Sequence, residues 1–198
     1  MNPTTTTSTT TMMNGVNVRQ FFDTMDAVRA DSTLARCFFR ARNRWVDGGH
    51  NQNTIRDYYC AGQELSRAES FVINADEPPV LLGLDRGANP VEIALAALAS
   101  CLTSSLIYHA AAKGIEIEEV ESQLEGFLDL QGFMGLSDQV RNGYQTIQIH
   151  FQIKAAAPEE TLRELCELAQ KRSPVFDIVS NPVPVTVTME KKQTVPGA

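Results

Sequence analysis

Residues that commonly bind metals or cofactors are scarce in this 198-residue sequence. It contains three histidines and four cysteines, and no two cysteines form a CxxC pair. His109 and His150 have no metal-ligand spacing to cysteines or carboxylates. A glycine-rich phosphate loop and a GxSxG motif are also absent. The sequence therefore predicts no metal site and no bound cofactor.

Clusters of positive charge and long apolar runs are missing too. The 17 lysines and arginines are scattered and are outnumbered by 24 acidic residues, which gives a net charge of -7. Nucleic-acid binding requires clustered positive charge, so we expect no nucleic-acid partner. The longest strongly apolar stretch, residues 93–102, is about half of the roughly twenty residues that a membrane span requires. We therefore expect no membrane partner.

The cysteines indicate the cellular compartment. Cys37, Cys60, Cys101 and Cys166 lie far apart in the sequence. Isolated cysteines of this kind are typical of reduced thiols in the cytoplasm rather than of a disulfide framework. The sequence also begins MNPTTTTSTTTMMNG, without the early positive charges and the apolar segment of a secretory signal. We expect a cytoplasmic protein with reduced cysteines.

Length and composition favour one globular domain with short additions. The hydrophobic fraction of 43% and the charged fraction of 21% are ordinary for a globular protein. A chain of 198 residues is long enough for one sizeable core. The boundaries that we expect are a disordered Thr-rich tail over 1–16, a helical appendage over 17–33, one domain over 34–192 and a short tail over 193–198.

Apolar periodicity predicts the order of helices and strands. A helix over about 18–30 begins at the N-cap Asn17, and a later helix over about 158–172 places Cys166 on its apolar face. Alternating residues predict a hairpin of 39–45 and 54–60, a short strand over 71–73, a strand pair over 115–130 and 145–154, and a final strand in VPVTVTME. This order predicts an α+β fold in which antiparallel sheets wrap a long buried central helix.

The predicted central helix, about 90–113, contains the most distinctive stretch of the sequence. Asn89 is a good N-cap, Pro90 suits the first helical position, and Glu92 completes a capping box. The helix is apolar almost all round for its first three turns, so we expect it to be buried on several sides. Cys101 lies in its middle, where a thiol either fills a small packing site or acts as a nucleophile.

A nucleophilic Cys101 needs a nearby cation, because the helix dipole fades beyond the first turn and cannot stabilise the thiolate. Arg44, on the polar face of the predicted hairpin, and His50 are the candidates. Glu92 serves either as the capping residue alone or in the Cys101 site as well. Nine helical residues correspond to a rotation of roughly 900° and a rise of about 13.5 Å, so Glu92 and Cys101 point to opposite faces. They can meet only across a twofold dimer.

Three segments resemble the OsmC/Ohr family of thiol-dependent hydroperoxide reductases: LLGLDRGANPVEIALAALASCL, AAAKGI and QKRSPVFDIVSNPVPV. The resemblance covers about 34–190. It implies an intertwined homodimer with two active sites at the interface, in which Cys101 attacks the peroxide O–O bond and an arginine of the first hairpin holds the thiolate. Arg44 is our choice for that arginine, with His50 as its rival, and Glu92 matches the active-site carboxylate of the family.

The resemblance also implies a second cysteine at the position that Ser173 occupies here. Serine cannot form a disulfide, so Cys166, another local cysteine or an external thiol has to reduce the oxidised Cys101; Cys166 lies on a core-facing helix and is a poor substitute. We expect a thiol peroxidase for oxidative-stress defence, without a bound cofactor, that reduces a small hydroperoxide with an external thiol. The alternative is a non-catalytic dimer that binds a small hydrophobic ligand or senses redox state.

Overall fold

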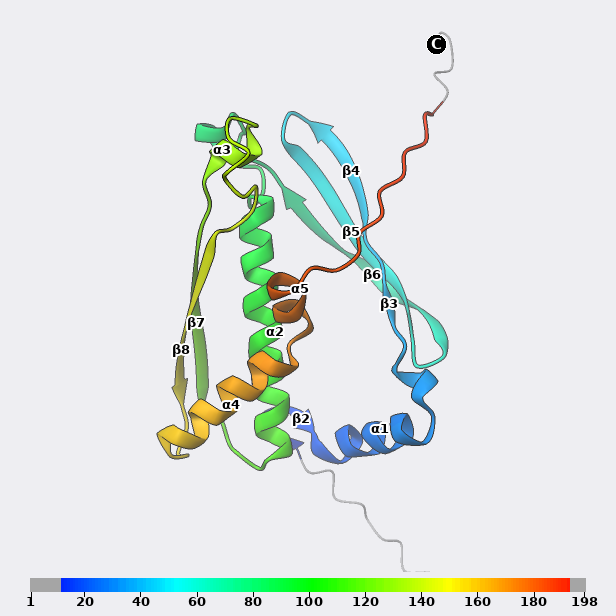
Figure 1. The fold of residues 1–198 in the computed structure, drawn as a ribbon. Coiled ribbons are helices and arrows are strands. Elements are labelled where there is room, and N and C mark those ends of the chain that lie inside the picture. The colour runs from blue at the N-terminus through cyan, green and yellow to red at the C-terminus, as the bar shows by residue number, and fades with distance from the viewer. Residues whose placement is uncertain (1–11, 193–198) are drawn as a thin grey trace, which may run out of the picture.

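A long helix, α2, stands at the centre of the fold, and the other elements are arranged around it (Figure 1). The structure, a computed structural model, describes residues 12–192. In chain order its elements are β1 (Met12–Met13), β2 (Val16–Asn17), α1 (Val18–Ala30), η1 (Ser32–Ala35), β3 (Phe38–Phe39), β4 (Arg42–Asp47), β5 (His50–Cys60), β6 (Gln63–Ala75), η2 (Pro79–Leu81), α2 (Pro90–Ala112), β7 (Glu119–Phe127), α3 (Leu130–Phe133), β8 (Thr146–Lys154), α4 (Glu159–Arg172) and α5 (Pro174–Ser180). These helices and antiparallel strands confirm the predicted α+β class.

The start of α2 is fixed by its own sequence. The Asn89 side chain accepts a hydrogen bond from the Val91 N–H (2.8 Å), and the Glu92 carboxylate accepts one from the Asn89 N–H (2.8 Å). Pro90 occupies the first helical position, where no backbone donor is needed. These contacts satisfy N–H groups that the first turn of a helix otherwise leaves without partners. The predicted capping box is confirmed.

The core lies where α2 meets α4 and the strand pair β7–β8. Leu106 and Ala110 of α2 pack with Leu165 and Ala169 of α4, and all four side chains are buried. β7 and β8 form a continuous antiparallel ladder, and alternate side chains of both strands turn towards the interior. The predicted strand pair and the predicted helix over 158–172 are both confirmed.

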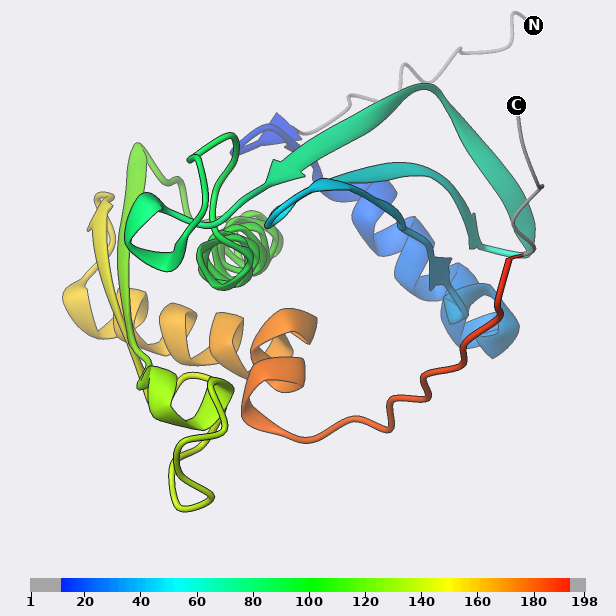
Figure 2. The same ribbon diagram turned by 90° about the horizontal axis from the view of Figure 1, so that it is seen from above.

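A four-stranded antiparallel sheet stands on the other side of α2 (Figure 2). β5 is its centre and pairs with β3, β4 and β6. No helix of residues 12–192 packs closely on this sheet, so Phe39, Trp45 and Phe71 remain 74%, 68% and 62% exposed. The predicted hairpin is confirmed, and the short strand expected over 71–73 is the end of the longer β6.

The N-terminal arm, which we define as residues 12–37, departs from the predicted boundaries. We expected a disordered tail over 1–16, but residues 12–17 form two short paired strands; residues 1–11 lie outside the described part. Asn14 and Gly15 connect them with positive φ values of 50° and 76°, as a two-residue type I′ turn requires. The predicted helix then follows as α1, and the Asn17 side chain caps it by accepting a hydrogen bond from the Gln20 N–H.

Cys37 and Cys60 form a disulfide, so the prediction that all cysteines are reduced is wrong. The register of β3 and β5 pairs Phe38 with Tyr59, and this places the two cysteines opposite each other at the next position. They are 23 residues apart in the sequence. The spacing of the cysteines in the sequence does not reveal such a pair, because the contact depends on which strands lie side by side. The other two cysteines are free.

The predicted final strand is also wrong for the single chain. Residues 182–192 have no regular secondary structure, and Val183, Val185, Val187 and Met189 are exposed. A strand is stable only when a neighbouring strand supplies its hydrogen bonds, and none within residues 12–192 pairs with this segment. The alternating pattern is therefore present without a partner strand.

α2 is apolar over a greater length than residues 93–102 suggested. At 23 residues it has the length and composition of a membrane-spanning helix, criteria that core helices of soluble proteins also meet. Only 17% of its apolar 18-residue stretch is buried inside the protomer. The sequence predicts burial on several sides, but within the protomer only Leu98, Leu102, Leu106, Ala110 and Ala111 of α2 are fully buried.

Candidate functional site

Cys101 lies midway along α2, close to the buried Leu98 and Leu102. Its thiol is free and half-buried. Among residues 12–192, no side chain forms a hydrogen bond or an ionic contact with its sulfur. Residues 12–192 of one protomer therefore supply no cation for this thiol.

Glu92 lies in the first turn of α2, where it is exposed and closes the capping box. α2 runs without a break past both residues, so Glu92 and Cys101 are separated by a rise of about 13.5 Å along its axis. A second carboxylate, Glu77, accepts a hydrogen bond from the Asn89 side chain and joins the preceding loop to the same cap. The structure does not bring Glu92 and Cys101 together within one protomer.

The two candidate cations lie on the four-stranded sheet. Arg44 is exposed on β4 and has no ion pair within residues 12–192. His50 begins β5, where its Nε2 is 3.4 Å from the Asn74 side-chain oxygen and its Nδ1 is 3.9 Å from the Asp47 carboxylate. Neither contacts Cys101, so the predicted constellation is not assembled by a single chain.

A buried carboxylate that the sequence did not single out, Asp76, organises the loop between β6 and α2. Its side chain is fully buried and accepts hydrogen bonds from the N–H groups of Glu77 (2.9 Å), Leu84 (3.3 Å) and Arg86 (3.2 Å). The Arg86 guanidinium donates a further bond to it (3.1 Å) and pairs with Asp47 at the β4–β5 turn (2.7 Å). Asp76 thereby ties the sheet to the loop that leads into α2.

These hydrogen bonds change the acidity of Asp76. Burial alone would raise its pKa, but the bonds donated by Arg86, Glu77 and Leu84 favour the charged form and lower the pKa to about 2. This value lies below the unfolded value of about 3.9. The ionised carboxylate therefore stabilises the fold fully above about pH 4, and the contribution is lost as the pH falls towards about 2.

We expect Asp76→Asn to lower the Tm at neutral pH by roughly 5 °C, because the neutral amide accepts these hydrogen bonds less well and leaves Arg86 without its buried partner. The difference from the wild type should shrink as the pH falls from about 4 to about 2. Circular dichroism melts over this range measure both effects, with the exposed Asp138→Asn as control. A difference that does not vary with pH would contradict the role assigned to the carboxylate.

Ser173 occupies the buried junction between α4 and α5, where its hydroxyl accepts a hydrogen bond from the Phe176 N–H (3.2 Å). α5 packs against α2, the helix that carries Cys101. Ser173 thus serves as the N-cap of α5, a role that suits a hydroxyl. Cys166 packs against the core between α2 and α4, and burial raises its pKa.

A hollow of about 480 Å³ opens where α2, α5, β8 and the loop before β8 meet. Leu98, about one turn before Cys101, lines it together with Phe176, Arg141 and Tyr144. Burial raises the pKa of the Tyr144 hydroxyl, which stays a hydrogen-bond donor to the first turn of α2. The hollow has the size and the mixed lining of a small-molecule site beside α2.

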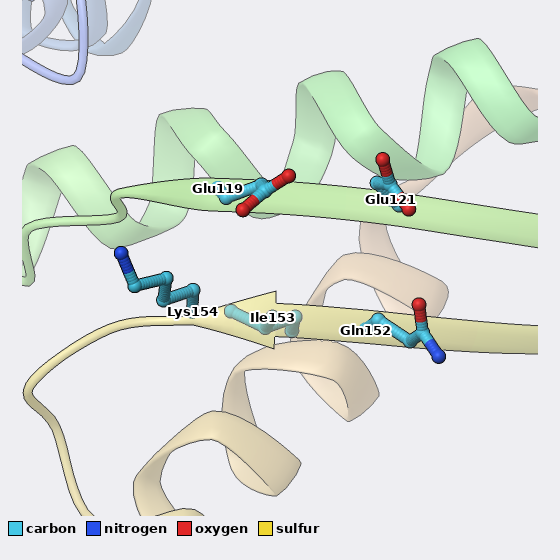
Figure 3. Close-up of a pocket in the computed structure, with 5 residues that line it drawn as sticks. All are labelled: Glu119, Glu121, Gln152, Ile153 and Lys154. Carbon is cyan, nitrogen blue, oxygen red and sulfur yellow. The ribbon is translucent and has the colours of Figure 1, made fainter.

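A smaller hollow of about 200 Å³ lies on the β7–β8 pair, and Figure 3 shows its side chains. Its lining consists of Glu119, Glu121, Gln152, Ile153 and Lys154. It contains no thiol, and the described part of the chain has no group of three or more metal-binding side chains. This hollow is a polar surface feature and not a candidate for thiol chemistry.

Residues 83–188 match the sequence model of a family described as OsmC-like protein, and this range is more than half of the chain. The chain belongs to the OsmC-like protein family. The family match includes α2 with Glu92 and Cys101, and it also includes Ser173. It begins after Arg44 and His50.

Solved structures share the fold of this OsmC-like protein. An OsmC-like protein from Mycoplasma pneumoniae has a TM-score of 0.58 at 18% identity, over 73% of this chain and 89% of its own. An OsmC-like protein of unknown function from Vibrio cholerae has a TM-score of 0.55 at 14% identity, over 71% and 92%. An organic hydroperoxide resistance protein from Legionella pneumophila has a TM-score of 0.51 at 18% identity, over 72% and 88%. No curated protein has a significantly similar sequence.

Proposed function

We propose that this OsmC-like protein is a thiol peroxidase that reduces organic hydroperoxides or hydrogen peroxide through Cys101. The Cys101 thiolate attacks the O–O bond, which breaks, and the leaving oxygen takes a proton from water. The products are a cysteine sulfenic acid and an alcohol, or water from hydrogen peroxide. Two external thiols, or one dithiol, then reduce the sulfenic acid to the thiol, with formation of water and a disulfide of the reductant. The cytoplasm, where thiol reductants are abundant, is the proposed location.

The observation that carries this proposal is the state of the four cysteines. Cys37 and Cys60 form a disulfide, and desolvation raises the pKa of the half-buried Cys166, which favours its unreactive thiol form. Cys101 remains, free and half-buried on α2, inside the range of the family match. The hydroperoxide resistance named for the Legionella pneumophila protein supports a peroxide as the substrate.

We further propose that the protein acts as a homodimer, because three of its surfaces lack a cover. One side of α2, the exposed aromatic side chains of the four-stranded sheet, and the unpaired segment 182–192 are left uncovered by other parts of residues 12–192. Monomeric proteins rarely expose apolar surface of this extent. A second copy beside α2, related by a twofold axis, covers the helix and the sheet and offers the segment a strand edge to pair with.

The dimer also completes the proposed site. Two α2 helices packed along each other place Glu92 of one copy near Cys101 of the partner subunit, which a single helix cannot do. Arg44 has no carboxylate partner within residues 12–192, so its guanidinium is available to hold a thiolate across the interface. His50 is the rival for this role.

A second candidate function is favoured by the hollow of about 480 Å³ and by Ser173. In this alternative the dimer binds a small hydrophobic ligand without turnover, and Cys101 packs in the interface or senses redox state. The alternative needs no second cysteine, and it agrees with the capping role of Ser173.

Removal of the Cys101 thiol tests the proposed peroxidase activity directly. We expect Cys101→Ser to lower the consumption of cumene hydroperoxide, in the presence of dithiothreitol or dihydrolipoamide, to the rate of the reductant alone. Cys166→Ser is the matched control and should keep wild-type turnover, because the Cys166 thiol packs against the core and its raised pKa favours the unreactive form. Absence of turnover in the wild type, or turnover that survives in Cys101→Ser, would rule the peroxidase out and leave the ligand-binding alternative.

Ser173→Cys tests whether a cysteine at this position can act as the second cysteine of the reaction. The new thiol should form a disulfide with the oxidised Cys101 and raise turnover with dihydrolipoamide at least about tenfold, because an intramolecular thiol reacts faster than an external one. Intact mass after one equivalent of peroxide distinguishes this disulfide from a sulfenic acid. Ser137→Cys, in the loop between α3 and β8, is the control and should form no such bond. Equal behaviour of the two variants would show that Ser173 lies out of reach of Cys101.

A further inference from the structure

The four-stranded sheet of β3–β6 (Figure 1) carries a hollow of about 210 Å³. Arginine side chains gather at this hollow, although the basic residues are scattered along the sequence. The lining consists of Arg40, Arg42, Thr54, Arg56, Asp57 and Ser70. All of these residues precede the range of the family match, which begins at residue 83, and none of them belongs to the proposed peroxidase site. The hollow is therefore a separate feature of this chain.

Three of the lining side chains are free to bind a ligand. The Arg42 guanidinium is exposed and has no hydrogen-bond or ion-pair partner in the described part of the chain. Thr54 lies directly opposite Arg42 in the β4–β5 ladder, and Ser70 belongs to the neighbouring strand β6. Both residues are half-buried, and their hydroxyl groups form no hydrogen bond with residues 12–192. Unused donors from three strands therefore line the hollow.

The other two arginines of the hollow are held in place by their neighbours. The Arg40 guanidinium donates two parallel hydrogen bonds to the Glu64 carboxylate (2.7 and 2.8 Å). Arg56 donates one bond from its Nε to the Arg67 carbonyl (3.2 Å), and Arg67 donates one to the Arg56 carbonyl (3.0 Å). The two Nη groups of Arg56 remain available. Side chains that are already held lose less conformational freedom when a ligand binds.

An irregularity in the sheet contributes to this arrangement. The pairing of β5 with β6 changes register between Ile55, which faces Phe71, and Asp57, which faces Ser66. Arg56 consequently lies opposite the whole stretch 67–70. Bulges of this kind redirect side chains and are common beside functional sites. Arg56 and Ser70, which both line the hollow, lie in this irregular stretch.

The charge and the size of the hollow favour a small anion. Its three guanidinium groups face a single lining carboxylate, that of Asp57, which already accepts a hydrogen bond from the Ser66 hydroxyl (2.8 Å). Positive charge therefore exceeds negative charge, even when the Glu64 carboxylate bound to Arg40 is counted. The volume of about 210 Å³ is below the roughly 300 Å³ at which sites for drug-sized ligands begin.

We propose that this hollow binds a phosphoryl group, as inorganic phosphate or as the phosphate of a small organic monoester. The planar fork of a guanidinium matches phosphate oxygens with two parallel hydrogen bonds. A tetrahedral phosphoryl group presents oxygens in several directions, so it can accept bonds from Arg42, from Arg56 and from the hydroxyl groups of Thr54 and Ser70 together. A planar carboxylate has only two oxygens and cannot use all of these donors.

Backbone amide signals in ¹H–¹⁵N NMR spectra test the site, with inorganic phosphate as the probe. The signals of Arg42, Thr54 and Ser70 should shift saturably, with an apparent Kd below about 5 mM. Phenyl phosphate should shift the same signals, and the tighter of the two ligands shows whether free phosphate or an organic phosphate is the source of the group. Acetate at equal ionic strength should cause no saturable shift. Absence of saturation with both phosphates, or equally tight binding of acetate, would overturn the proposal.

Three variants separate the site from the general charge of the protein. Arg42→Gln and Arg56→Gln should each weaken phosphate binding at least about tenfold, because each removes charge-assisted hydrogen bonds. Arg29→Gln is the matched control: it makes the same change of charge at an exposed position of α1 and should bind as the wild type does. Equal weakening in all three variants would overturn the proposal.

The opposing carboxylate provides a test of the opposite sign. Asp57→Asn removes the negative charge that lines the hollow and should tighten phosphate binding severalfold. Asp138→Asn, the exposed control, should leave the affinity unchanged. Unchanged or weaker binding in Asp57→Asn would contradict the placement of the anion in this hollow.

Discussion

The structure depends on one constraint: α2 is apolar almost all round, and its own chain cannot cover it. α4, α5 and β7 bury one side of the helix and form the core there. The four-stranded sheet stands on the other side without packing closely on it (Figure 2). Apolar surface of this extent costs free energy in water. The need to cover α2 therefore determines how the remaining parts of the chain are used.

The proposed site follows from the same constraint. Cys101 lies on the helix, whereas Arg44 and His50 lie on the sheet that the helix does not reach within one chain. Glu92 is held in the capping box, too far along the axis to meet the thiol. In the proposed dimer, the second copy that covers α2 also brings these groups to Cys101. In this proposal, assembly and chemistry have a common physical cause.

Local signals in the sequence were reliable, and long-range pairings were not. The capping box at Asn89 and the helix that follows Asn17 were predictable, because each depends on residues a few positions apart. The Cys37–Cys60 pair depends on strand register and the buried Asp76 on loop closure, and no local pattern reveals either. The final strand was predicted from a correct alternating pattern, but a strand needs a neighbour that one chain does not provide.

Cross-linking tests most directly whether a second copy covers α2. A thiol introduced by Glu92→Cys, in a Cys166→Ser background, cannot reach Cys101 of its own chain, because a rise of about 13.5 Å separates them. If two α2 helices pair as proposed, mild oxidation links each introduced thiol to Cys101 of the partner subunit. A denaturing gel without reductant then shows a band at twice the chain mass of 21.8 kDa. A band that remains at 21.8 kDa would contradict the pairing.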